Sequence, residues 1–281
     1  MTAARLLGRS TERKLRLLCL HGMYQDAATF SAKTKSLRGA DASVDFVFLN
    51  GPFTVVPPIL ARQSKRASAS CAASSKPKRV RCAKKTTEFR AWWRPLGIHQ
   101  EDPGSLDGDR GVLLAFLRAK LDEVGDVDGV VGFSQGASLA AWMCSREARE
   151  ELQWSPKLAV LVGSYLGSPQ YSLDSGVLPG IASLHVFGSN DYVIPAAKSQ
   201  QVVDIFKQEE TIENRVLTSV HSQGHVIPKC DDSRELFESF LTLQQLRLLG
   251  SPSISPSAAS EVVERDLAPS EALASQRVCA L

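Results

Sequence analysis

Residues 127–149 read VDGVVGFSQGASLAAWMCSREAR, and the fold follows from this stretch. The apolar run Val127–Phe133 predicts a buried strand, and Ala137–Arg149 predicts a helix that begins almost at once. Between them, residues 132–136 (GFSQG) form a G-x-S-x-G pattern in the strand–turn–helix context that a strained nucleophile turn requires. The pattern predicts that the Ser134 hydroxyl projects from the carboxyl edge of a sheet, above a helix N-terminus that favours negative charge.

The rest of the chain repeats this alternation of strand and helix. Short apolar runs predict five more strands, at Leu15–Leu20, Val44–Leu49, Leu158–Val162, Ser183–Phe187 and Arg215–Val220. Further helices are predicted at Gly111–Glu123, Pro195–Gln208 and Ser233–Leu248. Strands that are apolar on both faces and alternate with helices are typical of a mostly parallel sheet with helices on both faces. We therefore expect an α/β fold.

A nucleophilic serine needs a base, and the order of residues along the chain restricts the choice of histidine. In α/β-hydrolases an acid and then a histidine follow the nucleophile, which excludes the two histidines that precede Ser134. His185 lies inside a predicted strand, where a side chain is usually packed. His221 and His225 remain, and the turn-forming Gly224 favours His225.

His225 follows the sixth predicted strand along the chain. We expect the acid in the loop after the fifth. Asp191 follows the predicted strand Ser183–Phe187 at that place. Its carboxylate would accept the ring N–H of His225, fix the tautomer and stabilise the imidazolium. Asp174, in the preceding loop, is the alternative acid.

Backbone amides are the expected donors to an oxyanion. One is the N–H of Gln135, directly after the nucleophile, and the second is the N–H of Met23, in the loop after the first strand. Trp92 and Trp93 are candidate walls of an acyl-binding cleft, because indoles offer rigid apolar surface. The alternative for both is that they pack a loop onto the domain.

Composition and charge separate one segment from the rest of the domain. The 281 residues are 43% hydrophobic and 22% charged, with a formal net charge of +3. Residues 62–87 hold nine Lys or Arg and no acid, and they are poor in bulky apolar side chains, so we expect a disordered basic insertion. We expect an extension at 1–14, the domain at 15–248 with this insertion, and a flexible tail at 249–281.

The basic insertion suggests a second hypothesis from another class of function. A nuclear or nucleic-acid-associated protein could act through residues 62–87, whose positive charges could contact phosphates. No aromatic residues interleave with these charges, so we favour a solvated loop that binds no nucleic acid stably. Six scattered cysteines without metal-ligand spacing, and no apolar run long enough for a membrane span, favour a cytoplasmic location, with the nucleus as a further compartment.

Several longer motifs resemble the FSH (family of serine hydrolases) branch of the α/β-hydrolases. They are LCLHGMYQDAATF (18–30), FLNGPF (48–53), EFRAWWRP (88–95), VVGFSQGASLAA (130–141), FGSNDYVIP (187–195) and HSQGH (221–225). The resemblance implies an α/β-hydrolase fold and a triad of Ser134, Asp191 and His225. It also implies esterase or thioesterase activity on small acyl substrates without metal or organic cofactor. Gln223 departs from the pattern, since such relatives usually have Gly there.

Overall fold

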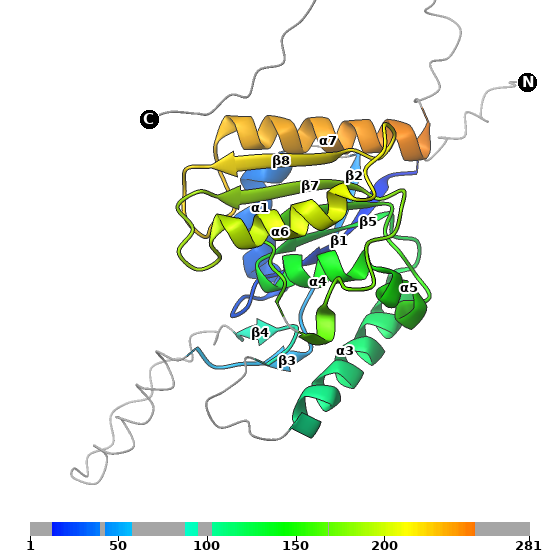
Figure 1. The fold of residues 1–281 in the computed structure, drawn as a ribbon, viewed down its shortest axis with the longest axis vertical. Helices are drawn as coiled ribbons and strands as arrows, with labels where there is room; N and C mark the ends of the chain where they lie inside the picture. Colours follow the sequence, from blue (N-terminus) through cyan, green and yellow to red (C-terminus); the bar gives the residue numbers. More distant parts are fainter. Residues whose placement is uncertain (1–12, 40–42, 58–87, 95–102, 168, 251–281) are drawn as a thin grey trace, which may run out of the picture.

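A computed structural model describes residues 13–39, 43–57, 88–94, 103–167 and 169–250 (Figure 1). These residues build a central sheet of six strands in the spatial order β2-β1-β5-β6-β7-β8, and every neighbouring pair is parallel. This confirms the expected α/β fold. The strands are β1 (Leu15–Leu20), β2 (Val44–Leu49), β5 (Gly129–Phe133), β6 (Leu158–Val162), β7 (Ala182–Gly188) and β8 (Val216–His221).

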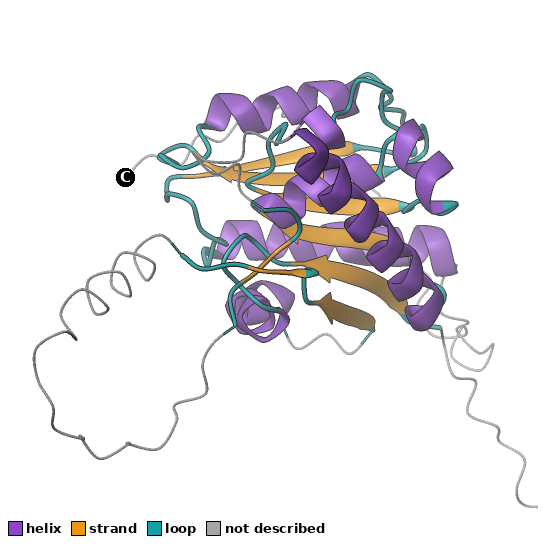
Figure 2. Ribbon diagram, turned by 90° about the horizontal axis from the view of Figure 1, so that it is seen from below, coloured by secondary structure: helices purple, strands orange, loops and turns teal. Residues whose placement is uncertain are grey.

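Helices cover both faces of the sheet (Figure 2). Because successive strand residues point to opposite faces, Leu18 of β1 packs in one core and Leu17 in the other. The Leu17 core contains Phe30 and Phe237 from two helices, α1 (Ala27–Arg38) and α7 (Asp231–Leu249). The Leu18 core takes its helical residues from α3 (Pro103–Val124), α4 (Gln135–Met143), α5 (Arg146–Leu152) and α6 (Ala196–Lys207).

The single helix expected at Ala137–Arg149 is wrong, because the structure has two helices there. α4 ends at Met143, and Ser145 caps α5 by accepting a hydrogen bond from the Ala148 N–H to its Oγ over 3.1 Å. A serine side chain that satisfies a free amide in this way starts a new helix. Apolar periodicity continues across the break and therefore does not reveal it.

The sequence did not predict α1 or the antiparallel pair of β3 (Phe53–Thr54) and β4 (Arg90–Ala91). Asp26 caps α1, since its Oδ1 accepts a hydrogen bond from the Thr29 N–H over 2.7 Å. Strands of two residues are too short to show periodicity. Residues 55–89 connect β3 to β4. The basic insertion predicted at 62–87 lies outside the described residues, as does the predicted tail at 249–281 apart from its first two residues.

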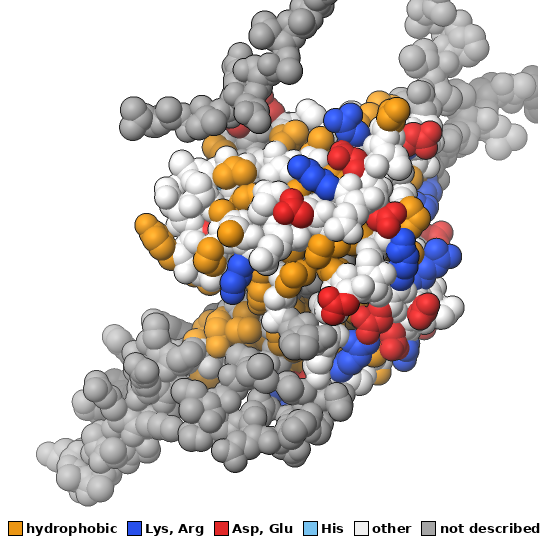
Figure 3. Space-filling view, viewed as in Figure 1, with side chains coloured by type: hydrophobic (Ala, Val, Ile, Leu, Met, Phe, Trp, Pro, Cys, Tyr) orange, Lys and Arg blue, Asp and Glu red, His pale blue; other side chains and the backbone are white. Residues whose placement is uncertain are grey.

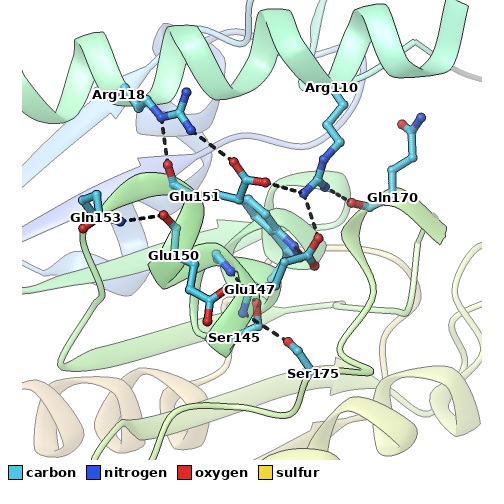
Figure 4. A network of polar contacts seen from close by, with 11 residues as sticks. Arg110, Arg118, Ser145, Glu147, Glu150, Glu151, Gln153, Gln170 and Ser175 are labelled. Atoms are coloured by element: carbon cyan, nitrogen blue, oxygen red, sulfur yellow. Dashed lines mark hydrogen bonds and ion pairs between the residues drawn. The ribbon is translucent and has the colours of Figure 1, made fainter. Parts of the chain in front are cut away.

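Charged side chains join α3 to α5 at the edge of the molecule (Figure 4). The Arg110 guanidinium lies 2.7 Å from Glu147 Oε1 and 3.5 Å from Glu151 Oε1, and it also donates to the Gln170 carbonyl. Arg118 contacts the same Glu151 over 3.1 Å. Side chains of both signs gather over these helices in the space-filling view (Figure 3). The contacts of the partly buried Arg110 tie α5 to α3, whereas the exposed Arg118 pair adds little stability.

The described part of the chain lacks membrane-spanning and metal-binding features. None of its helices is long and apolar enough to cross a bilayer. The same residues contain no group of His, Cys, Asp and Glu side chains placed to hold a metal ion. Its cysteines, Cys19, Cys144 and Cys230, are free thiols.

Candidate active site

The turn between β5 and α4 places Ser134 at the carboxyl edge of the sheet. Ser134 has φ 54° and ψ −119°, a backbone conformation that residues with a Cβ rarely adopt. The Ser134 N–H donates to the Val162 carbonyl of β6 over 2.8 Å, which helps to hold the turn. The serine lines a cavity of about 1330 Å³. The strained turn therefore presents the hydroxyl to a space that a ligand can enter.

The two glycines of the turn are required by close backbone contacts. A Cβ at Gly132 would stand 2.3 Å from the Gly136 carbonyl oxygen. A Cβ at Gly136 would stand 2.2 Å from the carbonyl oxygen of Leu20, at the end of β1. Neither position has space for a side chain, which explains the spacing of the G-x-S-x-G pattern.

Ser134, His225 and Asp191 form one hydrogen-bonded chain. The Ser134 Oγ lies 2.8 Å from His225 Nε2, and His225 Nδ1 lies 2.6 Å from Asp191 Oδ2. Because a carboxylate accepts hydrogen bonds, His225 donates through Nδ1–H and its Nε2 can accept the serine proton. The other carboxylate oxygen, Asp191 Oδ1, accepts from the backbone N–H groups of Val193 and Ile194 over 2.9 and 2.8 Å. These two amides fix the orientation of the carboxylate.

The competing residues occupy other places. Asp174 is exposed in the loop between β6 and β7. His221 is the last residue of β8, and neither of its ring nitrogens has a hydrogen-bond partner among the described residues. His185, inside β7, contacts Ser183 Oγ over 3.0 Å. Burial lowers the pKa of His185 to about 3 and lowers the pKa of His221 below its ordinary value. The structure thus brings His225 and Asp191 to Ser134.

The loops that carry the acid and the imidazole support each other. The Asn190 side-chain amide donates to the Ser222 carbonyl over 2.8 Å. A Cβ at Gly188 would stand 2.2 Å from the Gln223 carbonyl oxygen, so the two loops pack backbone to backbone. The Gln223 side chain is exposed. For this reason the departure from Gly at position 223 does not displace His225.

The two amides expected to bind an oxyanion belong to the first turn of α4 and to the loop after β1, both beside the serine. Gln135 is the first residue of α4, where an N–H has no partner within the helix. Met23 lines the same cavity as Ser134. The next residue, Tyr24, has φ 62°, and its N–H donates to the Arg90 carbonyl over 2.9 Å. The Tyr24 amide is therefore occupied, whereas the Met23 amide makes no hydrogen bond to any residue that the structure describes.

Buried hydrogen bonds connect the loop of Met23 to the first turn of α4. The Gln135 side chain accepts from the Trp92 N–H and donates to the Trp93 carbonyl, each over 2.9 Å. The Trp92 indole N–H donates to the His21 carbonyl over 2.7 Å. His21 Nε2 accepts from the Gly51 N–H over 2.9 Å, so its Nδ1–H is the atom that donates to the neighbouring Gly22 carbonyl.

These supporting roles of the Gln135 and His21 side chains were not predicted from the sequence. Both side chains are fully buried. The signals for them in the sequence are a large polar residue directly after Ser134 and a histidine directly after the first strand. Apart from the Gly22 carbonyl, their partners are backbone atoms of the two residues directly after β4 and of the loop before β3, at least 30 residues away. Local sequence patterns do not show such pairings.

Trp92 does not form a wall of the cavity, and this corrects the expectation for that residue. It is fully buried and contacts His21 in a tilted arrangement with ring centroids 5.0 Å apart. Trp93 stacks on Tyr171, and neither indole is among the residues that line the cavity beside Ser134. The positions of the two tryptophans match the alternative interpretation, in which both pack a loop onto the domain. Apolar side chains such as Tyr165, Ile194 and Ile227 line the cavity instead. The sequence alone does not show whether the indole of a loop residue lines a cleft or packs in a core.

Comparison with known proteins identifies the family of the chain. Residues 10–236 match the family model described as Serine hydrolase (FSH1). The chain is 31% identical over 239 residues to a mouse (Mus musculus) protein named Esterase OVCA2, with 81% of this chain and 95% of that protein covered. It is 28% identical over 237 residues to the zebrafish (Danio rerio) protein of the same name, with 81% and 96% covered.

Solved structures share the fold at low sequence identity. A carboxylesterase from Bacillus cereus superposes with a TM-score of 0.54 at 16% identity, covering 83% of this chain and 90% of that chain. Acyl-protein thioesterase 2 from Zea mays gives a TM-score of 0.51 at 18% identity, covering 83% and 96%. The parallel sheet, the serine turn and these likenesses define an α/β-hydrolase fold.

The class of protein follows from the fold, and the family follows from the sequence match. The molecule is an α/β-hydrolase. Its match covers most of the domain, so the chain belongs to the FSH1 family of serine hydrolases. It is an enzyme of the esterase and thioesterase type.

The tight serine turn generates a stability prediction with an internal control. We expect Gly136→Ala to lower the free energy of unfolding by about 3 kcal/mol, because the new Cβ would meet the Leu20 carbonyl oxygen at 2.2 Å. Gly111→Ala, in α3, has no atom within 4 Å of the new Cβ and should stabilise by about 0.5–1 kcal/mol. Urea denaturation of both variants measures the difference; equal effects would contradict the assigned contact.

Proposed function

We propose that this protein hydrolyses carboxylic esters or thioesters through an acyl-enzyme, with Ser134 as nucleophile, His225 as base and acid, and Asp191 as the carboxylate that orients the imidazole. The hydrogen-bonded chain of these three side chains is the observation that supports the proposal. The named esterases among the relatives support the ester as the reacting bond.

In the first step, Ser134 Oγ attacks the carbonyl carbon while His225 Nε2 takes the hydroxyl proton. The carbonyl electron pair moves to the oxygen and forms a tetrahedral oxyanion. When the intermediate collapses, the alcohol or thiol leaves with the proton from His225. Water then repeats the sequence on the acyl-enzyme, with His225 again taking and returning a proton. The products are a carboxylic acid and the alcohol or thiol.

The proposed oxyanion site consists of the Met23 and Gln135 backbone amides. Both belong to segments that meet the Ser134 turn, and the N-terminus of α4 adds a favourable dipole for negative charge. Each such donor is worth about 3 kcal/mol of transition-state stabilisation, because it is positioned before charge develops. The buried hydrogen bonds of Gln135 and Trp92 would keep the two amides in place.

Replacement of Ser134 is the direct test of the proposed nucleophile. We expect Ser134→Ala to lower kcat for p-nitrophenyl esters by about 10⁴-fold or more and to abolish covalent labelling by a fluorophosphonate probe. Ser175→Ala, a change at an exposed serine away from the cavity, should label and turn over like the wild type. Undiminished labelling of the Ser134→Ala variant would exclude the proposed nucleophile.

Matched amide variants distinguish between the two aspartates that the sequence offers as the acid of the triad. Asp191→Asn should lower kcat by about 10⁴-fold, because an amide that donates to His225 Nδ1 would favour the wrong tautomer. Asp174→Asn should leave kcat within about twofold, since Asp174 is exposed between β6 and β7. Steady-state kinetics on one ester decide between them, and a large loss in the Asp174 variant alone would reverse the assignment.

Loss of the Trp92 indole N–H tests the support of the oxyanion site. Trp92→Phe removes the hydrogen bond to the His21 carbonyl, and we expect kcat to fall about tenfold with little change in KM. Trp142→Phe is the control, because Trp142 is also fully buried and its indole N–H donates to Glu147 Oε2 over 3.1 Å. Equal kinetic losses in both variants would mean that Trp92 contributes only to general stability.

A further inference from the structure

The cavity that contains Ser134 extends well beyond the reacting groups. Its volume of about 1330 Å³ exceeds the roughly 300–1,000 Å³ of common small-molecule sites. It begins among Met23, Ser134 and His225, continues past the loop that follows His225, and reaches residues of α1 and α7. One continuous space therefore links the proposed nucleophile to the outer surface of these two helices.

The chemical character of the lining changes along this space. Next to Ser134 and His225 it is apolar, with Phe133, Tyr165, Val193, Ile194, Val226 and Ile227. An apolar stretch of this kind fits a hydrocarbon chain and binds it by burial of its surface. The end near α1 and α7 instead carries charge. Its charged lining residues are Lys33, Lys35, Lys229, Arg234 and Glu238.

Positive charge predominates at that distal end. Arg234 is paired with Asp231 over 2.9 Å. Lys33, Lys35 and Lys229 form no ion pair with any residue that the structure describes, and all are exposed. Glu238 is the one acidic residue among the described lining residues. Three lysines thus remain available to an anionic group of a ligand.

The geometry of α1 places two of these lysines on either side of the helix face that lines the cavity. Ala32 and Ser36 line the cavity and share one face of the helix, because they are spaced four residues apart. Gly39, the residue after the end of the helix, also lines the cavity. Lys33 and Lys35 project to opposite sides of that face at about 100° per residue. They lie on the order of 10 Å along the helix from its start at Ala27, which closely follows the cavity-lining residues 23–25.

We propose that the preferred substrates are esters or thioesters whose acyl chain ends in an anionic group, bound by Lys33, Lys35 and Lys229. The inference depends on the proposed hydrolysis at Ser134. The chain occupies the apolar stretch, and its terminal carboxylate meets the lysines at the α1 end. A chain of medium length spans this separation, whereas a short one leaves the carboxylate among apolar side chains, where its desolvation is unfavourable.

Matched pairs of esters test the proposal. The p-nitrophenyl half-esters of suberic and sebacic acid are compared with p-nitrophenyl octanoate and decanoate, which differ by the terminal carboxylate alone. The measured quantity is the ratio of kcat/KM for the anionic ester to that for the neutral ester. We expect the wild type to favour the half-esters, and the ratio to decrease as salt screens the lysines.

Charge-removing variants locate the effect. In a variant that combines Lys33→Gln, Lys35→Gln and Lys229→Gln, the ratio should fall about tenfold, as expected when several exposed ion pairs are lost together. Lys198→Gln/Lys207→Gln is the control, because both lysines are exposed on α6, over the other face of the sheet, and neither lines the cavity. An equal ratio in the wild type, the cavity variant and the control would overturn the proposal, as would a wild type that favours the neutral esters.

A binding measurement separates failure of this inference from failure of the proposed chemistry. Calorimetry with the Ser134→Ala variant, which cannot turn over the esters, should show that it binds the suberic half-ester more tightly than the octanoate ester. The three lysine changes should remove this difference. If the wild type hydrolyses no ester but this difference in binding remains, the proposed reaction is wrong and the anion site stands. If hydrolysis depends on Ser134 but neither rate nor binding responds to the carboxylate, the anion site alone is wrong.

Discussion

The contact between the first turn of α4 and the end of β1 is the constraint on which the rest of the site depends. A Cβ at Gly136 would stand 2.2 Å from the Leu20 carbonyl oxygen and 2.5 Å from that of His21. The two backbones therefore touch with no side chain between them. This contact brings the loop of Met23 beside Ser134, so that amides from two segments more than 100 residues apart can face one reacting atom.

The same packing supports an unfavourable backbone conformation. A residue such as Ser134 with positive φ costs about 1–3 kcal/mol. Every residue of α4 is buried, and β5 lies between β1 and β6 in the centre of the sheet. Burial of these two elements offsets the local cost. The strained backbone of Ser134 persists because the buried strand before it and the buried helix after it are held in place by their packing.

The imidazole reaches Ser134 across a strand that supplies no reacting group. β6 lies between β5, which carries the serine, and β7, which precedes the acid loop. Directly after β6, Gly163 has φ 61°, and a Cβ there would stand 3.2 Å from His225 Cε1. A side chain at this position would push against the ring. The glycine lets the ring of His225 lie over the end of β6 and still meet both partners.

The sequence by itself determined the alternation of strands and helices, the serine turn, and the order of the proposed nucleophile, acid and base, because these depend on local periodicity, glycine spacing and chain order. It favoured His225 over His221 and Asp191 over Asp174 without excluding either alternative, and it left Trp92 and Trp93 between a cleft wall and a packed loop. Only the tertiary structure decided these points, since they depend on which loops meet. The Gln135–Trp92–His21 hydrogen bonds and the lysine-lined end of the cavity join segments that no local pattern relates.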